Sequence, residues 1–301
     1  MRIGTLNMFQ QGVNAIIDRQ NDIFRTQQQL SSGKRINRPS DDPSGAAQLL
    51  GLSKSLKVTD QHQRNIDSVS SRLELEDSSL AGVGDALQRA RELTVQGLND
   101  TNGPVARAGI AKEIRQILDQ VKGLANRTDA TGEYLFAGFK GQSAPFSDNG
   151  AGVFSYTGDQ GQRLVQVGAA RQIADGNSGF DVFMKIPAAS GGGYKDVFST
   201  LYKLATDLEA NAPNPASLDQ LDNAMRNITG IRATVGARLN AADSQKTVNA
   251  SLIEQMTNTR STIEDLDYAK AASRLSRQSV TLQAAQQAFV KVQNLNLFKF
   301  L

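Results

Sequence analysis

Apolar side chains form a narrow stripe at each end of the chain. In residues 6–30 and again in residues 275–292 they recur at alternating steps of three and four, although Gln20, Gln27 and Gln278 occupy three of the positions. So narrow a stripe is typical of two long helices that share one contact line. We therefore predict that the ends pair as a coiled coil, with a contact line that consists of Leu6, Phe9, Val13, Ile16, Ile23, Leu30, Leu275, Leu282, Ala285, Phe289 and Val292.

The distribution of proline predicts long helices. Proline removes a backbone donor and clashes with the preceding helical turn, so a stretch without it can stay helical over many turns. Pro104 suits the first position of one helix, and Asn214 followed by Pro215 suits the start of another, whose pattern persists almost to Leu295. The three proline-free blocks are residues 1–38, 44–103 and 216–301.

The centre of the chain has a different composition. Thirteen of the 26 glycines lie in residues 132–193, and eleven of the 17 Phe and Tyr side chains lie in residues 134–202. Two alternating runs in residues 152–168 predict a β-hairpin around a glycine-bounded turn, and the alternation in residues 179–186 predicts a further strand. The centre is therefore predicted to be a β-rich insert.

Together these patterns predict a mainly α fold with a β insert. The expected architecture is a long antiparallel helical hairpin or bundle, with paired terminal coiled-coil helices and a small β-rich domain at the tip. The predicted domains are a terminal coiled-coil domain (1–42 and 263–301), a helical shaft domain (43–133 and 208–262) and an insert domain (134–207).

One segment, LSSGKRINRPSDDPSGAA at residues 30–47, separates two helical patterns. Gly33 suits the left-handed position after a helix, and Arg38 is extended because proline follows it. Asp42 suits a helix N-cap, with Pro43 in the first turn. An anion site at this helix start is the less favoured alternative. The predicted connector consists of Gly33, Lys34, Arg35, Arg38, Asp41, Asp42 and Pro43.

Charge and residue usage exclude several functions. The net charge is +3 without a long run of Lys or Arg, which argues against nucleic-acid binding. The absence of cysteine excludes disulfides, thiolate metal sites and cysteine nucleophiles. The one histidine, His62, allows no catalytic triad or two-histidine metal site, and acidic pairs such as Glu74 and Glu76 are expected on solvated helix faces. We predict a protein that is not an enzyme, with no catalytic residue, cofactor or metal site.

No stretch of the sequence predicts membrane insertion. No window approaches about 18 consecutive apolar residues, the length at which a helix begins to span a bilayer. Residues 1–12 lack the apolar core of about 7–15 residues that a secretory signal peptide needs. A route out of the cell would therefore need no cleaved signal.

Several motifs resemble those of bacterial flagellins and their relatives. They are LSSGKRIN followed by DDPSGAA, LQRARELTVQ at residues 87–96, and SRLSRQSVTLQAAQQAFVKVQNL at residues 273–295. The resemblance covers most of residues 1–130 and 215–301. Within the family, the DDP form of the first motif, the segment GEYLFAGFKGQSAPF, the ending NLFKFL and the modest length are similar to the adaptor between hook and filament rather than to filament flagellins.

The resemblance implies a structural adaptor whose paired terminal helices line the core of a tubular assembly. It also implies an extracellular location in the bacterial flagellum, reached through the flagellar type III apparatus. The implied partners are copies of the chain itself, another hook-associated protein, flagellin and a cytoplasmic export chaperone. In such an assembly, Lys34, Arg35 and Arg38 are expected to be free to meet acidic residues of neighbouring subunits.

The LQRARELTVQ segment supplies candidates for contacts between subunits, namely Arg89, Arg91, Glu92 and Leu93. In flagellins this segment is similar to what animal innate receptors recognise, and Arg89 and Leu93 match the arginine and leucine positions chiefly involved. Two alternative functions stay open. The chain could be a short flagellin that builds the filament itself, or a surface adhesin that uses the aromatic-rich insert as a ligand groove.

Overall fold

The computed structural model describes residues 2–189 and 191–294, with side chains from 7–189 and 191–291. It is 69% helical, which confirms the predicted mainly α fold with a β insert. The helices are α1 (Arg2–Ser32), α2 (Pro43–Leu98), α3 (Pro104–Ala125), α4 (Val197–Glu209), α5 (Ala216–Glu264) and α6 (Tyr268–Asn294), with a π-helical turn η1 (Phe180–Met184). The strands are β1 (Phe146–Asp148), β2 (Phe154–Tyr156), β3 (Leu164–Gly168), β4 (Arg171–Ala174), β5 (Ile186–Pro187) and β6 (Tyr194–Lys195).

The chain separates into two compact units. One unit is Thr59–Ala250, and the other combines Met1–Val58 with Ser251–Leu301. We call them the central unit and the terminal unit. Because α2 and α5 each run through both units, the boundaries lie within long helices. The finer division into coiled coil, shaft and separate insert domain stays a prediction.

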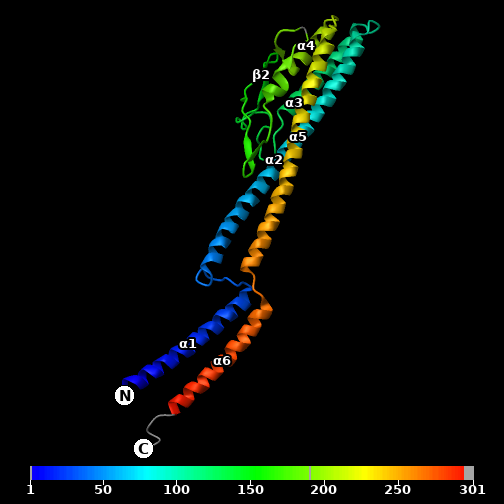
Figure 1. Ribbon diagram of the computed structural model, residues 1–301. Coiled ribbons are helices and arrows are strands. Elements are labelled where there is room, and N and C mark those ends of the chain that lie inside the picture. Colours follow the sequence, from blue (N-terminus) through cyan, green and yellow to red (C-terminus); the bar gives the residue numbers. More distant parts are fainter. Residues whose placement is uncertain (1, 190, 295–301) are drawn as a thin grey trace, which may run out of the picture. The chain divides into compact units, whose positions relative to one another are not determined.

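The central unit contains most of the hydrophobic core. Fully buried leucines and isoleucines of α2 and α3 pack together, and α3 lies against α4 (Figure 1). Four phenylalanines of the insert and α4 form an aromatic cluster around Phe183, whose ring centre lies 5.2–5.7 Å from those of Phe136, Phe146 and Phe198. These aromatic side chains fill the insert's own interior, which supports a core role for them rather than a ligand groove.

The predicted starts of two helices are confirmed. α3 begins at Pro104, and α5 begins at Ala216, whose N–H donates to Asn214 Oδ1 at 3.0 Å. The pattern after Pro215 was expected to continue almost to Leu295, and the structure corrects this expectation. α5 ends at Glu264 and α6 begins at Tyr268, so the helix is interrupted by three residues.

The strand pairing of the insert differs from the prediction. Residues 152–168 do hold two strands, but β2 pairs with β1 and β3 pairs with β4, each pair antiparallel. The predicted hairpin is therefore wrong. Its turn is taken up by Asp159, which accepts the N–H groups of Phe139 (3.0 Å) and Gly161 (2.8 Å) and so holds the chain against another segment.

Residues 179–186 do not form the predicted strand. They contain η1 and, at Ile186, the first residue of the two-residue strand β5. A strand would place neighbouring side chains on opposite faces, whereas both Val182 and Phe183 are fully buried in one core. The π-helical turn allows this, so packing overrides the alternating pattern.

The insert packs along the side of α2 and α5 instead of continuing beyond their ends. Asn65 of α2 donates to the carbonyl of Gln166 at 2.7 Å, and Asn249 of α5 donates to the carbonyl of Val167 at 3.0 Å. Both carbonyls belong to β3, so the β3–β4 hairpin ties the two long helices together. None of the described helices is long and apolar enough to cross a membrane.

Candidate assembly interface

The terminal unit is built on an antiparallel pair of helices, α1 and α6 (Figure 1). Near one end, the rings of Phe9 and Phe289 lie 5.3 Å apart. Further along, Thr26 Oγ1 donates to Gln278 Oε1 at 2.9 Å. The predicted pairing of the two terminal segments is therefore present within one chain.

The pairing only partly covers the predicted contact line. Phe9 remains 45% exposed, and the side chains of Leu6 and Val292 lie outside the described residues. That these residues contact other subunits stays a prediction. The half-buried members are Val13, Ile16, Ile23, Leu30, Leu275, Leu282, Ala285 and Phe289.

The contact line on α1 departs from the strict heptad after Ile16. Gln20 and Gln27 are exposed, while Thr26 and Gln29 are buried at 3% and 7% exposure. The two buried polar side chains are both hydrogen-bonded. Thr26 donates to Gln278 Oε1 at 2.9 Å, and Gln29 Nε2 donates to the carbonyl of Arg35 at 2.7 Å. Thr26, and not the predicted Gln27, therefore lies on the contact line.

Gly12 of α1 allows the ring of Phe289 on α6 to approach the α1 backbone closely. A Cβ atom at Gly12 would lie 2.7 Å from the Phe289 ring, too close for any side chain without a shift. The ring therefore lies directly on the α1 backbone at this point. Sequence periodicity did not single out Gly12, because glycine has no side chain to register in an apolar pattern.

A second set of apolar side chains on the terminal helices faces away from the pair. On α1, Ile17 is 47% exposed and Phe24 is 63% exposed. Each follows a predicted contact position by one residue, so an apolar side chain beside the heptad line was the available sequence signal. The other members of this outer set are Met8, Val280 and Val290.

The terminal unit has almost no interior of its own. Among its described hydrophobic side chains, only Ile36, Leu56 and Ala271 are buried. Exposed apolar surface of this extent is typical of a surface that another protein covers. The terminal unit is therefore the candidate interface.

The connector is hydrogen-bonded to the chain that leaves α5. The carbonyl of Gly33 accepts the N–H of Leu266 at 3.0 Å, and the N–H of Arg35 donates to the carbonyl of Glu264 at 2.6 Å. Gly33 has φ +71°, as predicted for the residue after a helix. The break between α1 and α2 and the break between α5 and α6 thus lie side by side and are hydrogen-bonded to each other.

Two basic residues of the connector are not free, contrary to our expectation. Lys34 Nζ lies 2.5 Å from Glu264 Oε1, and Arg35 contacts Asp42 at 3.1 Å while donating to the carbonyl of Ile263 at 2.8 Å. Of the three basic connector residues, only Arg38 has an exposed side chain without an acidic partner among the described residues. Arg38 alone keeps the predicted availability for another subunit.

The two aspartates of the connector stabilise its turn. Asp41 accepts the N–H groups of Asn37 (3.1 Å) and Arg38 (2.9 Å). Asp42 precedes Pro43 at the start of α2 and accepts the N–H of Gly45 at 2.9 Å, a bond that, with the Ser44 hydroxyl, lowers the pKa of Asp42. This carboxylate already caps the helix, which argues against the alternative of an anion site.

Substituting Gly33 with alanine is expected to destabilise the protein by about 1–2 kcal/mol, because a left-handed conformation is strained for any residue with a Cβ. The added Cβ would also lie 2.8 Å from the Tyr268 hydroxyl. Chemical unfolding followed by circular dichroism measures the change. Gly51→Ala is the control, since Gly51 is helical with open space around it and its substitution should stabilise by about 0.5–1 kcal/mol. Equal effects of the two substitutions would contradict the role of Gly33.

The four contact candidates of α2 lie in different environments. Arg89 and Glu92 are each 54% exposed in their side chains, and Arg89 pairs with Glu113 at 2.8 Å. Arg91 pairs with Asp222 at 2.7 Å. Leu93 is 2% exposed in the core, which corrects its candidacy, because a buried side chain cannot contact a partner.

Known proteins share the whole length of this chain. The bacterial flagellin N-terminal helical region matches residues 3–140, and the C-terminal helical region matches residues 218–301. Flagellar hook-associated protein 3 of Escherichia coli K12 is 32% identical over 99% of both chains. The chain belongs to the bacterial flagellin family.

Further relatives within the flagellin family place the similarity more finely. Flagellar hook-associated protein 3 of Salmonella typhimurium is 30% identical over 99% of both chains. Flagellin of Bacillus subtilis is 26% identical over 87% of this chain and 86% of its own. The similarity to hook-associated protein 3 is thus both higher and more extensive than that to this flagellin.

Solved structures of the flagellin family share the fold. A putative flagellar hook-associated protein of Vibrio parahaemolyticus matches with TM-score 0.67 and 24% identity, over 75% of this chain and 100% of its own. Hook-associated protein 3 of Legionella pneumophila matches with TM-score 0.67 and 19% identity, over 70% of this chain and 98% of its own.

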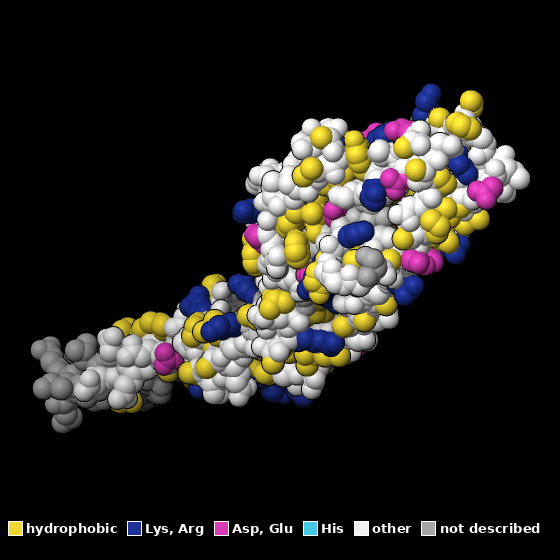
Figure 2. Space-filling view, turned by 90° about the horizontal axis from the view of Figure 1, so that it is seen from above, with side chains coloured by type: hydrophobic (Ala, Val, Ile, Leu, Met, Phe, Trp, Pro, Cys, Tyr) yellow, Lys and Arg dark blue, Asp and Glu magenta, His cyan; other side chains and the backbone are white. Residues whose placement is uncertain are grey.

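Charged side chains of both signs are mixed on the described surface (Figure 2). On the face in Figure 2, Lys and Arg side chains are spread over the molecule among Asp and Glu instead of forming one basic patch. Within the described residues, no group of three or more His, Cys, Asp or Glu side chains is arranged to hold a metal ion. The relatives named above are flagellar structural proteins.

Proposed function

We propose that this chain is the structural adaptor that joins the flagellar hook to the filament, and that it assembles through its terminal unit. The similarity to hook-associated protein 3 over 99% of both chains is the observation that carries the proposal. The mechanism rests on the outer set of apolar side chains, which the α1–α6 pair leaves exposed.

Burial of the outer set requires neighbouring subunits. Apolar surface removed from water contributes about 25 cal/mol per Å², and α1 and α6 cannot cover these side chains by themselves. Contacts between different surfaces of successive copies generate rings or helical arrays instead of closed dimers. A junction between two tubes needs such an arrangement.

The proposed partners follow from a location between the hook and the filament. Copies of the chain surround it laterally, another hook-associated protein lies on the hook side, and flagellin lies on the filament side. We further propose export through the flagellar type III route without a cleaved signal, with a cytoplasmic chaperone for the C-terminal region, and a final location outside the cell. These finer statements rest on the resemblance to the family.

Cells that lack this chain are expected to carry hooks without filaments and to release flagellin into the medium. The physical reason is that the first flagellin subunits have no matching surface on which to add. Electron microscopy of deleted and complemented cells, with flagellin quantified in the medium, measures both effects. Normal filaments on deleted cells would contradict the proposal.

The purified chain distinguishes the filament-forming alternative. A flagellin would build the filament itself, so the purified chain would grow into long fibres when concentrated. We expect short assemblies only, because an adaptor occupies a single zone. Sustained fibre growth of the purified chain would favour a short flagellin over an adaptor.

A further inference from the structure

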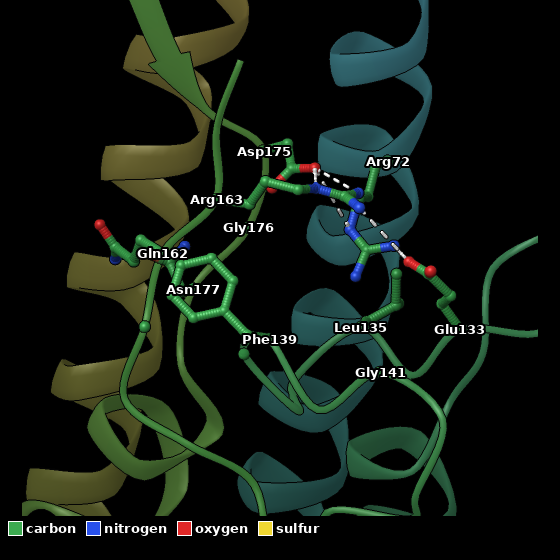
Figure 3. Close-up of a pocket in the computed structure, with 12 residues that line it drawn as sticks. Arg72, Glu133, Leu135, Phe139, Gly141, Gln162, Arg163, Asp175, Gly176 and Asn177 are labelled. Carbon is green, nitrogen blue, oxygen red and sulfur yellow. Dashed lines mark hydrogen bonds and ion pairs between the residues drawn. The ribbon is translucent and has the colours of Figure 1, made fainter.

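A buried cluster of charges lies where α2, α5 and the insert meet in the central unit. We call it the polar joint and define it by Arg72 and Glu76 of α2, Asp175 and Asn177 of the insert, and Arg238 of α5. Figure 3 shows the insert side of this cluster around a small cavity of about 80 Å³, with Arg72 pointing toward Asp175 and Glu133.

Glu76 is at the centre of the polar joint and is only 1% exposed, although the sequence predicted a solvated acid. Its Oε1 accepts a hydrogen bond from Asn177 Nδ2 at 2.8 Å. Asn177 Oδ1 in turn accepts from Arg238 Nη1 at 3.1 Å, and the same nitrogen donates to the carbonyl of Gly176 at 3.2 Å. Asn177 of the insert therefore links Glu76 of α2 to Arg238 of α5, three segments that are distant in the sequence.

The cations near Glu76 are shared with other carboxylates. Arg72 pairs with Asp129 and lies 3.7 Å from Glu133 and 4.0 Å from Asp175. Arg163, also on the insert, pairs with Asp175 at 2.5 Å and with Glu133 at 3.5 Å. Ser79 lies one turn after Glu76 on α2, and its hydroxyl accepts a hydrogen bond at 3.4 Å from Arg127, which follows α3.

The surroundings of Glu76 show what its proton changes. Among the described residues, Glu76 forms no ion pair, and its hydrogen bond comes from the neutral amide of Asn177. A carboxylate that is 1% exposed and has no paired cation is costly to ionise, so the neutral form suits this site. Burial raises the pKa of Glu76 to about 7, against the opposing hydrogen bond from Asn177 and the attraction of Arg238 and Arg72.

We propose that Glu76 is a proton-dependent lock, whose neutral form fastens α2, α5 and the insert more firmly than its ionised form. A carboxyl group that binds its proton more tightly in the folded than in the unfolded chain stabilises the fold fully below its unfolded pKa. That stabilisation is lost as the pH rises through about 7. The central unit is therefore most stable in mildly acidic surroundings.

Chemical unfolding of the full-length chain between pH 5 and pH 8 tests the lock. For the wild type, the unfolding constant should rise on the order of 100-fold across this interval. Glu76→Gln should lose most of this slope and unfold less readily than the wild type at pH 8. The control Glu74→Gln, at an exposed position of the same helix, should keep the wild-type slope.

A wild-type slope in Glu76→Gln, or greater wild-type stability at pH 8 than at pH 5, would overturn the proposal. If the glutamine variant fails to fold, the wild-type protein still decides. The ¹³C resonance of the Glu76 carboxyl should titrate near pH 7, and titration complete below about pH 5.5, closer to the ordinary range of a glutamate, would equally overturn it.

Discussion

Replacing Phe183 with alanine is expected to lower the free energy of unfolding by about 3–5 kcal/mol, the range for truncating a buried phenylalanine. Phe183 is fully buried, and its ring contacts three other phenylalanine rings within 5.7 Å. Because those neighbours come from separate segments of the insert and from α4, few of them can move into the vacated space. Urea unfolding followed by circular dichroism measures the change.

Phe139→Ala is the matched control for this prediction. Phe139 belongs to the same insert but is 67% exposed, so its truncation should change the free energy of unfolding by no more than about 0.5 kcal/mol. Similar losses for the two variants would mean that the aromatic cluster does not hold the insert together.

Placing aspartate at both Ile17 and Phe24 is expected to abolish assembly while leaving the isolated subunit folded. Both side chains are largely exposed in the single chain, at 47% and 63%, so the subunit should lose little stability. In the proposed assembly they are covered, and burying an unpaired carboxylate costs several kcal/mol. A loss of 2.8 kcal/mol or more would reduce incorporation by at least about 100-fold.

Aspartates placed on the central unit control for added charge. Val153 and Tyr194 are 61% and 63% exposed, which matches the exposure of Phe24, but they lie in or beside the insert. The double substitution of these two residues should leave incorporation unchanged. Equal loss in both double variants would point to a general effect of charge instead of contacts through the terminal unit.

Local signals in the sequence predicted much of the helical structure. Gly33 adopts the left-handed conformation after α1, Asp42 caps α2, and Pro104 begins α3, each for a reason confined to a few residues. The pairing of α1 with α6 also followed from one-dimensional spacing, since each stripe needs a partner of the same kind. The contact with other subunits stays a prediction.

Features that depend on distant segments could not be read in the same way. Between β2 and β3, Asp159 accepts the N–H of Phe139, twenty residues earlier in the chain, where the sequence predicted a local turn. Glu76 resembles a solvated acid in sequence, and only the approach of Asn177 and Arg238 reveals its burial. The outer set was not predicted, because a strict heptad pattern does not include the position beside the contact line.

The most direct test of the central claim is incorporation at the hook. In cells that lack the native chain, the fraction of hooks bearing a filament is counted by electron microscopy after supplying either the wild type or the Ile17→Asp and Phe24→Asp double variant at equal expression. We predict that the wild type restores filaments and that the folded, exported double variant does not. Filaments restored equally by the double variant would contradict assembly through the terminal unit.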